Sequence, residues 1–266
     1  MQLATLRLRD GGRLPCVVPQ DQATAGEIGL CVNTPAQVAE GRILKLLTPE
    51  RHLIEVKAKD IIGIEMDPPY VLVENFLSEA EAEQAMAYAL AHESGFRDST
   101  VVHVDAQGSY TTDTRLRRSR ILDDVSGVAP MIGGRLHERM PRIFQALEIQ
   151  PIAFRTMELQ LSVHGDGDFF NTHTDNGLPE IAHRTMSYVY YFHREPKRFT
   201  GGHFKLYRTV IHEGTHSAGD LVADIDPPRN GLMVFPSYIQ HEVTPLTCSS
   251  AALEDQRLTL NGWLVA

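Results

Sequence analysis

The sequence has few cysteines, no long apolar run and no excess of basic residues, and each absence narrows its possible functions. The three cysteines, Cys16, Cys31 and Cys248, are odd in number and far apart, which argues against a disulfide framework and suits a reducing compartment. No stretch of about 18 apolar residues is present, so we expect no membrane span. The amino terminus lacks the basic start and apolar stretch of a secretory signal. We therefore predict a cytoplasmic protein.

The charge balance is acidic, with 25 Lys and Arg against 34 Asp and Glu and a net charge of −9. A general nucleic-acid-binding surface needs the opposite sign, so we predict no nucleic-acid partner. The cluster RLRRSR is a local basic exception. Its residues Arg115, Arg117 and Arg118 could hold an acidic group of a substrate, although solvated surface arginines are the commoner case.

Residues 1–66 are expected to form a small β-rich unit, to which the sequence assigns no role. The segment LRLRDGGRLPCVV predicts two short strands around Asp10-Gly11-Gly12. GRILKLLTPERHLIEVKAKDIIGIEM contains further strand-like runs, broken at Thr48-Pro49, and Asp67-Pro68-Pro69 ends the region. We therefore place a second domain at residues 67–266.

The second domain is expected to begin with a strand and a helix. YVLVENF has the composition of a strand, and Ser78 followed by Glu81 forms a capping box at the start of a helix that Gly95 would end. Another helix is predicted over Val128 to Leu147, although Pro141 weakens it.

After Pro151 the sequence becomes rich in strands separated by turns. FRTMELQLSV alternates apolar and polar residues, and MSYVYYF, GHFKLY, GLMVFP and RLTLNGWLV follow it. Many short strands at this spacing indicate a β-sandwich or barrel. The fold class is therefore mainly β with flanking helices (α+β), with a core at about residues 151–266.

The segment GDGDFFNTHTDNG carries the most informative pair of residues. His173 and Asp175 are one residue apart, so in a strand their side chains project to the same face. His241 follows the predicted strand GLMVFP. Two histidines and one carboxylate form a triad that leaves three metal positions open, as in non-haem iron(II) oxygenases.

The triad has an ordinary alternative, because the chain has 12 histidines and chance pairs with an acidic residue are expected. His241 could be a surface histidine at a strand end. A cupin-type metal-binding or isomerase protein is an alternative of another class, although cupins usually carry more histidine ligands.

From about Tyr70 to Ala266 the chain resembles the prolyl 4-hydroxylase-like branch of the Fe(II)/2-oxoglutarate-dependent dioxygenases. The matching segments occur in the family's order: HTDN (173–176), SYVYYF (187–192), TGGHFKLY (200–207), VFPSYIQHEV (234–243) and RLTLNGW (257–263). The resemblance implies a double-stranded β-helix, or jelly-roll, core that binds iron(II) through His173, Asp175 and His241. It implies no catalytic residue beyond these three ligands.

The resemblance also implies a cosubstrate site. Arg257 matches the basic residue that pairs with the distal carboxylate of 2-oxoglutarate, and a guanidinium can hold a carboxylate with two hydrogen bonds. An ion pair of Arg257 with Asp255 or Glu254 is the structural alternative. Tyr190 matches a tyrosine that donates to the same carboxylate, with core packing as its alternative.

Three further residues are expected to line the pocket. Asn261 and Trp263 lie at even spacing from Arg257 and so share its face, and Val243 follows His241.

Two departures from the family pattern stand out. The gap from His241 to Arg257 is longer than usual, and Val163 and His164 lie near the position of a tyrosine that many members have.

The resemblance implies an enzyme that hydroxylates a C–H bond with iron(II), 2-oxoglutarate and dioxygen, with ascorbate as a possible reductant. We favour a prolyl residue in a peptide or protein as substrate, with a free amino acid or small metabolite as the alternative. The sequence does not predict the oligomeric state.

Overall fold

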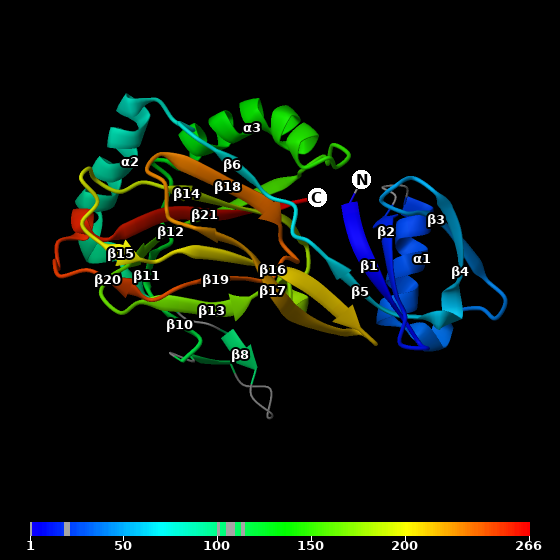
Figure 1. Cartoon of the computed structure of the whole chain (residues 1–266). Helices are drawn as coiled ribbons and strands as arrows, with labels where there is room; N and C mark the ends of the chain where they lie inside the picture. The colour runs from blue at the N-terminus through cyan, green and yellow to red at the C-terminus, as the bar shows by residue number, and fades with distance from the viewer. Residues whose placement is uncertain (1, 19–21, 100–101, 105–109, 113–114) are drawn as a thin grey trace. The chain divides into compact units, whose positions relative to one another are not determined.

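The structure is a computed structural model that describes residues 2–18, 22–99, 102–104, 110–112 and 115–266 (Figure 1). Two compact units are present. Unit 1 comprises Met1–Pro69, Phe144–Pro151 and Leu206–Val222, and unit 2 comprises Tyr70–Ile143, Ile152–Lys205 and Ala223–Ala266. Within the described ranges, no helix has both the length and the apolar character needed to cross a membrane.

Unit 1 is an antiparallel sheet with one amino-terminal helix. The predicted hairpin is confirmed, because β1 and β2 pair from Gln2↔Val18 to Arg7↔Arg13. The later strand-like runs also form strands, and β5 pairs with β1 and with the distal part of β16. The elements are β1 (Gln2–Leu8), β2 (Arg13–Val18), α1 (Gln22–Asn33), β3 (Ile43–Leu47), β4 (Leu53–Lys57), β5 (Ile61–Met66), the part of β16 (Phe204–His212) from Leu206, and β17 (Thr215–Ile225) to Val222.

The core of unit 1 forms because alternate strand residues point to one face. Leu44 and Leu46 of β3 are buried, whereas Ile43 and Lys45 between them are exposed. These leucines join a cluster with Leu6 of β1. Helix α1 was not expected from the sequence.

Unit 2 is built on two antiparallel sheets. The first has the order β6-β18-β14-β21-β12-β11-β7, and in the second β10, β13 and β19 lie side by side. Figure 1 shows β14, β21 and β12 in one layer, with β13 and β19 in another. The strands are β6 (Val71–Val73), β7 (Arg97–Asp98), β8 (Val102–Val104), β9 (Tyr110–Thr112), β10 (Arg117–Arg118), β11 (Arg120–Leu122), β12 (Thr156–His164), β13 (Phe169–His173), β14 (Arg184–Tyr191), β15 (Thr200–Gly201), β18 (Gly231–Pro236), β19 (His241–Val243), β20 (Leu246–Thr247) and β21 (Arg257–Val265). The strand-rich region predicted after Pro151 is therefore confirmed.

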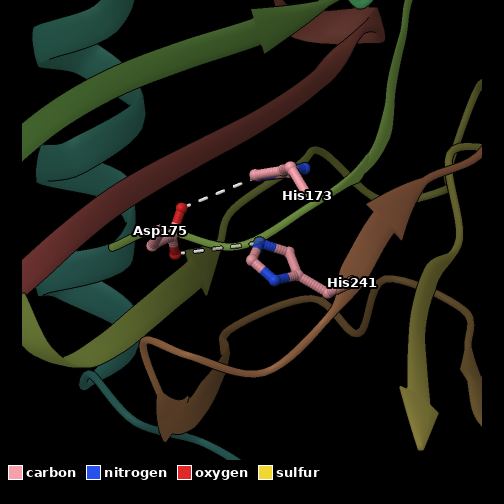
Figure 2. A group of neighbouring side chains, drawn as sticks. All are labelled: His173, Asp175 and His241. Atoms are coloured by element: carbon pink, nitrogen blue, oxygen red, sulfur yellow. Dashed lines mark ion pairs between the residues drawn. The ribbon is translucent and has the colours of Figure 1, made fainter. Parts of the chain in front are cut away.

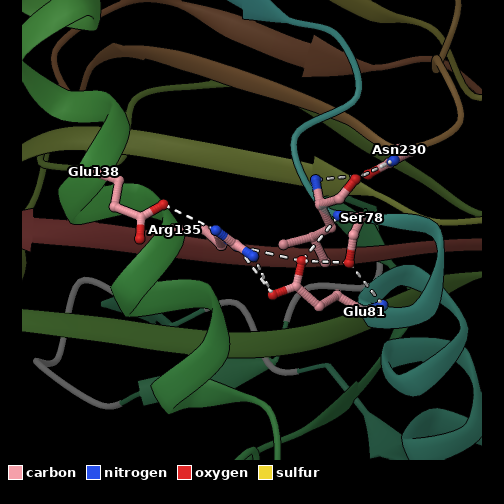
Figure 3. A network of polar contacts seen from close by, with 6 residues as sticks. Ser78, Glu81, Arg135, Glu138 and Asn230 are labelled. Carbon is pink, nitrogen blue, oxygen red and sulfur yellow. Dashed lines mark hydrogen bonds and ion pairs between the residues drawn. The ribbon is translucent and has the colours of Figure 1, made fainter.

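Two helices, α2 (Glu79–Ala91) and α3 (Ala129–Ala146), flank the first sheet of unit 2. The predicted capping box is present, since Ser78 Oγ accepts from the Glu81 backbone N–H and Glu81 Oε2 accepts from the Ser78 backbone N–H (Figure 3). Arg135 of α3 donates to the same Glu81 carboxylate at 2.9 Å. Helix α2 ends at Ala91, one short 3-10 turn before the predicted stop.

Candidate active site

Three side chains from two neighbouring strands converge in unit 2 (Figure 2). His173 ends β13 and His241 begins β19, and the two residues are paired partners across these strands. Asp175 follows β13, with Oδ1 3.7 Å from His173 Nε2 and Oδ2 3.7 Å from His241 Nε2. The ligand atoms of these three residues lie within 4.8 Å of one another. In the described part of the chain, this is the one group of three or more His, Cys, Asp or Glu residues that could hold a metal ion.

Backbone carbonyls orient both imidazoles. Nδ1 of His173 lies 2.7 Å from the Asn171 carbonyl oxygen, and Nδ1 of His241 lies 2.8 Å from that of Ile239. Because a carbonyl oxygen can only accept, each Nδ1 must carry the proton. The lone pair is then on Nε2, the atom that faces Asp175, and this arrangement is typical of metal-binding histidines.

The electrostatics keep His173 and Asp175 in their metal-binding protonation states. Burial, together with the neighbouring His241, lowers the pKa of His173 to about 3, so its imidazole is neutral at pH 7. Burial raises the pKa of Asp175, but the two imidazoles and the hydroxyl of Ser187, which donates to Oδ2 at 2.6 Å, bring it below its ordinary value. A carboxylate and two imidazoles suit a divalent metal, and their number leaves coordination positions for other ligands.

Aromatic rings pack against both histidines. The Phe170 ring stacks on His173 with ring centroids 3.5 Å apart, and Phe204 and Phe235 lie 5.2 and 4.9 Å from His241. These contacts fix the imidazoles and keep water from that side of the site.

A guanidinium without a carboxylate partner among the described residues lies in the same cavity as the triad. Arg257 is 2% exposed, yet its Nε and Nη2 have no hydrogen-bond partner among the described residues. Its Nη1 is 3.4 Å from Nδ1 of His164. The predicted alternative of an ion pair with Asp255 does not occur, because Asp255 pairs with Arg194 at 3.2 Å. Buried donors are nearly always satisfied, so this guanidinium fits an anionic ligand such as a carboxylate.

The structure does not place Tyr190 beside Arg257, which corrects the sequence-based assignment. The hydroxyl of Tyr190 donates to Asn230 Oδ1 at 3.0 Å, and its ring lies 5.5 Å from that of Phe76. Tyr191 is the tyrosine beside Arg257, because Arg257 Cζ lies 5.2 Å from its ring centroid. Adjacent strand residues point to opposite faces, and Ser187, which contacts Asp175, shares the face of Tyr191.

The other sequence-predicted residues lie in the cavity. Asn261, Trp263 and Val243 all line it. Asn261 donates to Ser162 Oγ at 2.8 Å, and the Trp263 ring lies 3.6 Å from Arg184 Cζ.

Sequence reasoning missed several lining residues, including His164, Phe170, Phe204 and Gln160. His164 could have been found, because it and Val163 lie near the position where many members of the family have a tyrosine. Arg117, noted only as part of a basic cluster, also lines the cavity.

Comparison with known proteins shows what this chain is similar to. The model described as "2OG-Fe(II) oxygenase superfamily" matches residues 159–265. An uncharacterized PKHD-type hydroxylase of Synechocystis sp. is 30% identical over 197 residues, which cover 73% of this chain and 62% of that protein. The chain therefore spans less than two thirds of this relative's length.

Two solved structures share the fold. A Pseudomonas putida prolyl-4-hydroxylase matches with a TM-score of 0.51 and 18% identity, covering 74% of this chain and 92% of that one. A Trichoplax adhaerens prolyl hydroxylase, in complex with a peptide fragment of the hypoxia inducible factor oxygen degradation domain, matches with a TM-score of 0.52 and 16% identity, covering 74% and 84%. The shared fold confirms the predicted jelly-roll core. The matches to the family model and to the relative agree with the resemblance to the Fe(II)/2-oxoglutarate-dependent dioxygenases.

Proposed function

We propose that this chain is an iron(II)- and 2-oxoglutarate-dependent dioxygenase that hydroxylates a C–H bond of its substrate, because the 2OG-Fe(II) oxygenase model matches residues 159–265. The observation that carries the proposal is the placement of the triad and Arg257 in one cavity. We assign the activity to the domain at residues 67–266.

The triad His173, Asp175 and His241 would hold iron(II) through the two Nε2 atoms and the carboxylate. When bound, iron(II) and 2-oxoglutarate supply the activation of dioxygen for hydroxylation. The chain's own residues therefore need to bind and orient these groups and to exclude water. No general base is required, which agrees with the absence of an acid/base pair among the described residues that line the cavity.

Arg257 would bind the distal carboxylate of 2-oxoglutarate through its two unsatisfied nitrogens. Tyr191 would donate its hydroxyl hydrogen to the same carboxylate, since that hydroxyl is buried and has no partner among the described residues. Burial raises the pKa of Tyr191 to about 12, so the hydroxyl keeps its proton at pH 7. His164, whose pKa burial lowers well below its ordinary value, is neutral and adds no charge there.

We propose a prolyl residue in a peptide or protein as the substrate. The support is the fold shared with two prolyl hydroxylases, one of which was solved with a peptide bound. A free amino acid or small metabolite is the alternative substrate. We also propose ascorbate as the reductant and the cytoplasm as the location, where the three buried cysteines would stay reduced.

The test is 2-oxoglutarate turnover. The purified chain, incubated in air with iron(II), ascorbate, 2-oxoglutarate and a library of proline-containing peptides, should form succinate and a product 16 mass units heavier, as one added oxygen requires. The variant Asp175→Asn should form neither. Metal binding without any effect of 2-oxoglutarate on the metal's spectrum would instead support a cupin-like protein.

A further inference from the structure

Arg117 is held on the strand next to the first metal ligand. It opens β10, which pairs antiparallel with β13 through Arg117↔Phe170, and β13 ends at His173. The side chain is half-buried and lines the same cavity as the triad and Arg257. The structure therefore places a second cation in this cavity.

The partners of Arg117 are neutral. Its Nε donates to Ser119 Oγ at 2.8 Å and its Nη2 to Ser162 Oγ at 3.4 Å, while its Cζ lies 4.9 Å from the Phe170 ring centroid. Within the described residues, no carboxylate lies within ion-pair distance of it. A guanidinium has five N–H donors, so these two bonds leave enough donors for a two-point contact with an anion.

Neighbouring arginines are paired differently. Arg118, the next residue, points to Asp168, with Nε 2.8 Å from Oδ1, and its side chain is 53% exposed. Arg184, which lies over the ring of the lining residue Trp263, has Nη2 2.6 Å from Glu158 Oε2. Arg117 has lost much of its hydration without gaining such a counter-ion, which is costly unless a ligand supplies one.

The charge of Arg117 persists at neutral pH. Burial lowers the pKa of Arg117 to about 10, opposed by the negative charge of Asp175. Asp175 itself is a metal ligand in the proposed function and already accepts from Ser187. The negative charge of Asp175 would therefore be shared with the metal, and the guanidinium of Arg117 would remain available to an anionic ligand.

We propose that Arg117 binds a carboxylate group of the substrate, next to the carbon that is hydroxylated. The proposal rests on the proposed function, in which Arg257 already binds the distal carboxylate of 2-oxoglutarate. Arg117 therefore selects among substrates: a free amino acid, a carboxy-terminal prolyl residue or a prolyl residue beside an acidic side chain can satisfy it. An internal prolyl residue with neutral neighbours cannot.

Matched pairs of probes test this charge preference. N-acetyl-L-proline and N-acetyl-L-prolinamide differ in a single carboxylate, and acetyl-Ala-Pro-Asp-amide and acetyl-Ala-Pro-Asn-amide differ in one side chain. Binding is measured by calorimetry under nitrogen, with the protein loaded with Mn(II) and 2-oxoglutarate, so that no turnover is needed. The first pair reports on a free carboxylate and the second on an acidic neighbour.

We expect the wild-type protein to bind the acidic member of at least one pair about tenfold more tightly than the neutral member. Arg117→Gln should abolish this preference and leave 2-oxoglutarate affinity unchanged, and Arg117→Lys should keep part of the preference. Arg118→Gln is the matched control and should behave as wild type. Thermal unfolding of each variant checks that it is folded.

Three results would overturn the proposal: no preference in either pair, a preference that survives in Arg117→Gln, or a loss of 2-oxoglutarate binding in that variant. The failure of the proposed function is a separate result, because it is recognised when the wild-type protein with iron(II) forms no succinate from 2-oxoglutarate.

Discussion

Arg257 and His164 are directly paired across β21 and β12, and Nη1 of the guanidinium lies 3.4 Å from Nδ1 of the imidazole. Burial lowers the pKa of both side chains, so the pair at the base of the cavity is one cation beside one neutral ring. An anion can therefore bind here without competition from an internal carboxylate.

Arg257→Met should weaken 2-oxoglutarate binding about 100-fold or more, because a buried carboxylate would lose its charge-assisted bonds. Arg257→Lys should retain part of the affinity through a single charged contact. Calorimetry with the Mn(II)-loaded protein under nitrogen measures both. Arg194→Met, which removes an arginine paired with Asp255, should bind 2-oxoglutarate normally; equal losses in all three variants would contradict the assignment.

Tyr191→Phe should raise the KM for 2-oxoglutarate about tenfold, since one hydrogen bond to a charged group is lost. Tyr190→Phe should leave this KM unchanged and lower the thermal stability, because the Asn230 amide oxygen loses a buried donor. Succinate formation as a function of 2-oxoglutarate concentration measures the first effect. The reverse pattern would return the role to Tyr190.

Metal binding should depend on the triad. Mn(II) at about 100 times its dissociation constant should stabilise the wild-type protein by about 2.7 kcal/mol, and EDTA should remove this gain. Asp175→Asn and His241→Ala should show no such gain. His183→Ala, which alters a half-exposed histidine paired with Glu158, is the control and should respond as wild type. A metal-dependent shift in Asp175→Asn would refute the ligand assignment.

Glu81 should make α2 sensitive to acid. Hydrogen bonds from Ser78 and Arg135 lower the pKa of Glu81 to about 2, below its ordinary value of 4.5. The folded state thus favours the charged form, so its contribution is complete above pH 4.5 and is lost as the pH falls towards 2. Glu81→Gln, which keeps a capping-box residue, should lose this pH dependence, and Glu81→Ala should destabilise by about 1 kcal/mol at pH 7. Urea unfolding between pH 2 and pH 7 measures these differences; an unchanged pH dependence in Glu81→Gln would contradict this account.

Gly262→Ala should destabilise unit 2 by about 1–3 kcal/mol through overpacking. A β-carbon at this position would lie 2.2 Å from the Tyr188 hydroxyl oxygen and 2.4 Å from the Glu158 carbonyl oxygen, in the middle of the first sheet. Gly134→Ala in α3 is the control, because nothing lies within 4 Å of its β-carbon. It should stabilise instead, since alanine favours a helix. Urea unfolding measures both, and a neutral Gly262→Ala would contradict the steric argument.

Local patterns predicted much of the fold. The hairpin around Asp10-Gly11-Gly12, the capping box at Ser78 and the helix over 129–146 each depend on neighbours in sequence, so they could be recognised without tertiary contacts. Helix α1 was missed because its sequence carries neither an acidic first turn nor a basic last turn.

The site was predictable where one motif determines the geometry. The spacing of His173 and Asp175 marked both ligands, although Asp175 lies in a turn after β13 rather than in the strand. The choice between Tyr190 and Tyr191 needs a tertiary contact. Alternation states that the two tyrosines face opposite ways, and only the bond from Ser187 to Asp175 shows which way is inward. The orientation of Arg117 likewise depends on the pairing of β10 with β13.

The pairing of β13 with β19 has a mechanical consequence. This ladder has two paired positions, with an irregularity between them, and one of the two pairs is His173↔His241. Such a short ladder opens easily, but an ion bound to both imidazoles ties the two strands together at that rung. Amide hydrogens of β13 and β19 should then exchange with solvent more slowly when the metal is bound. The exchange rate of these two strands would therefore report whether the metal site is occupied.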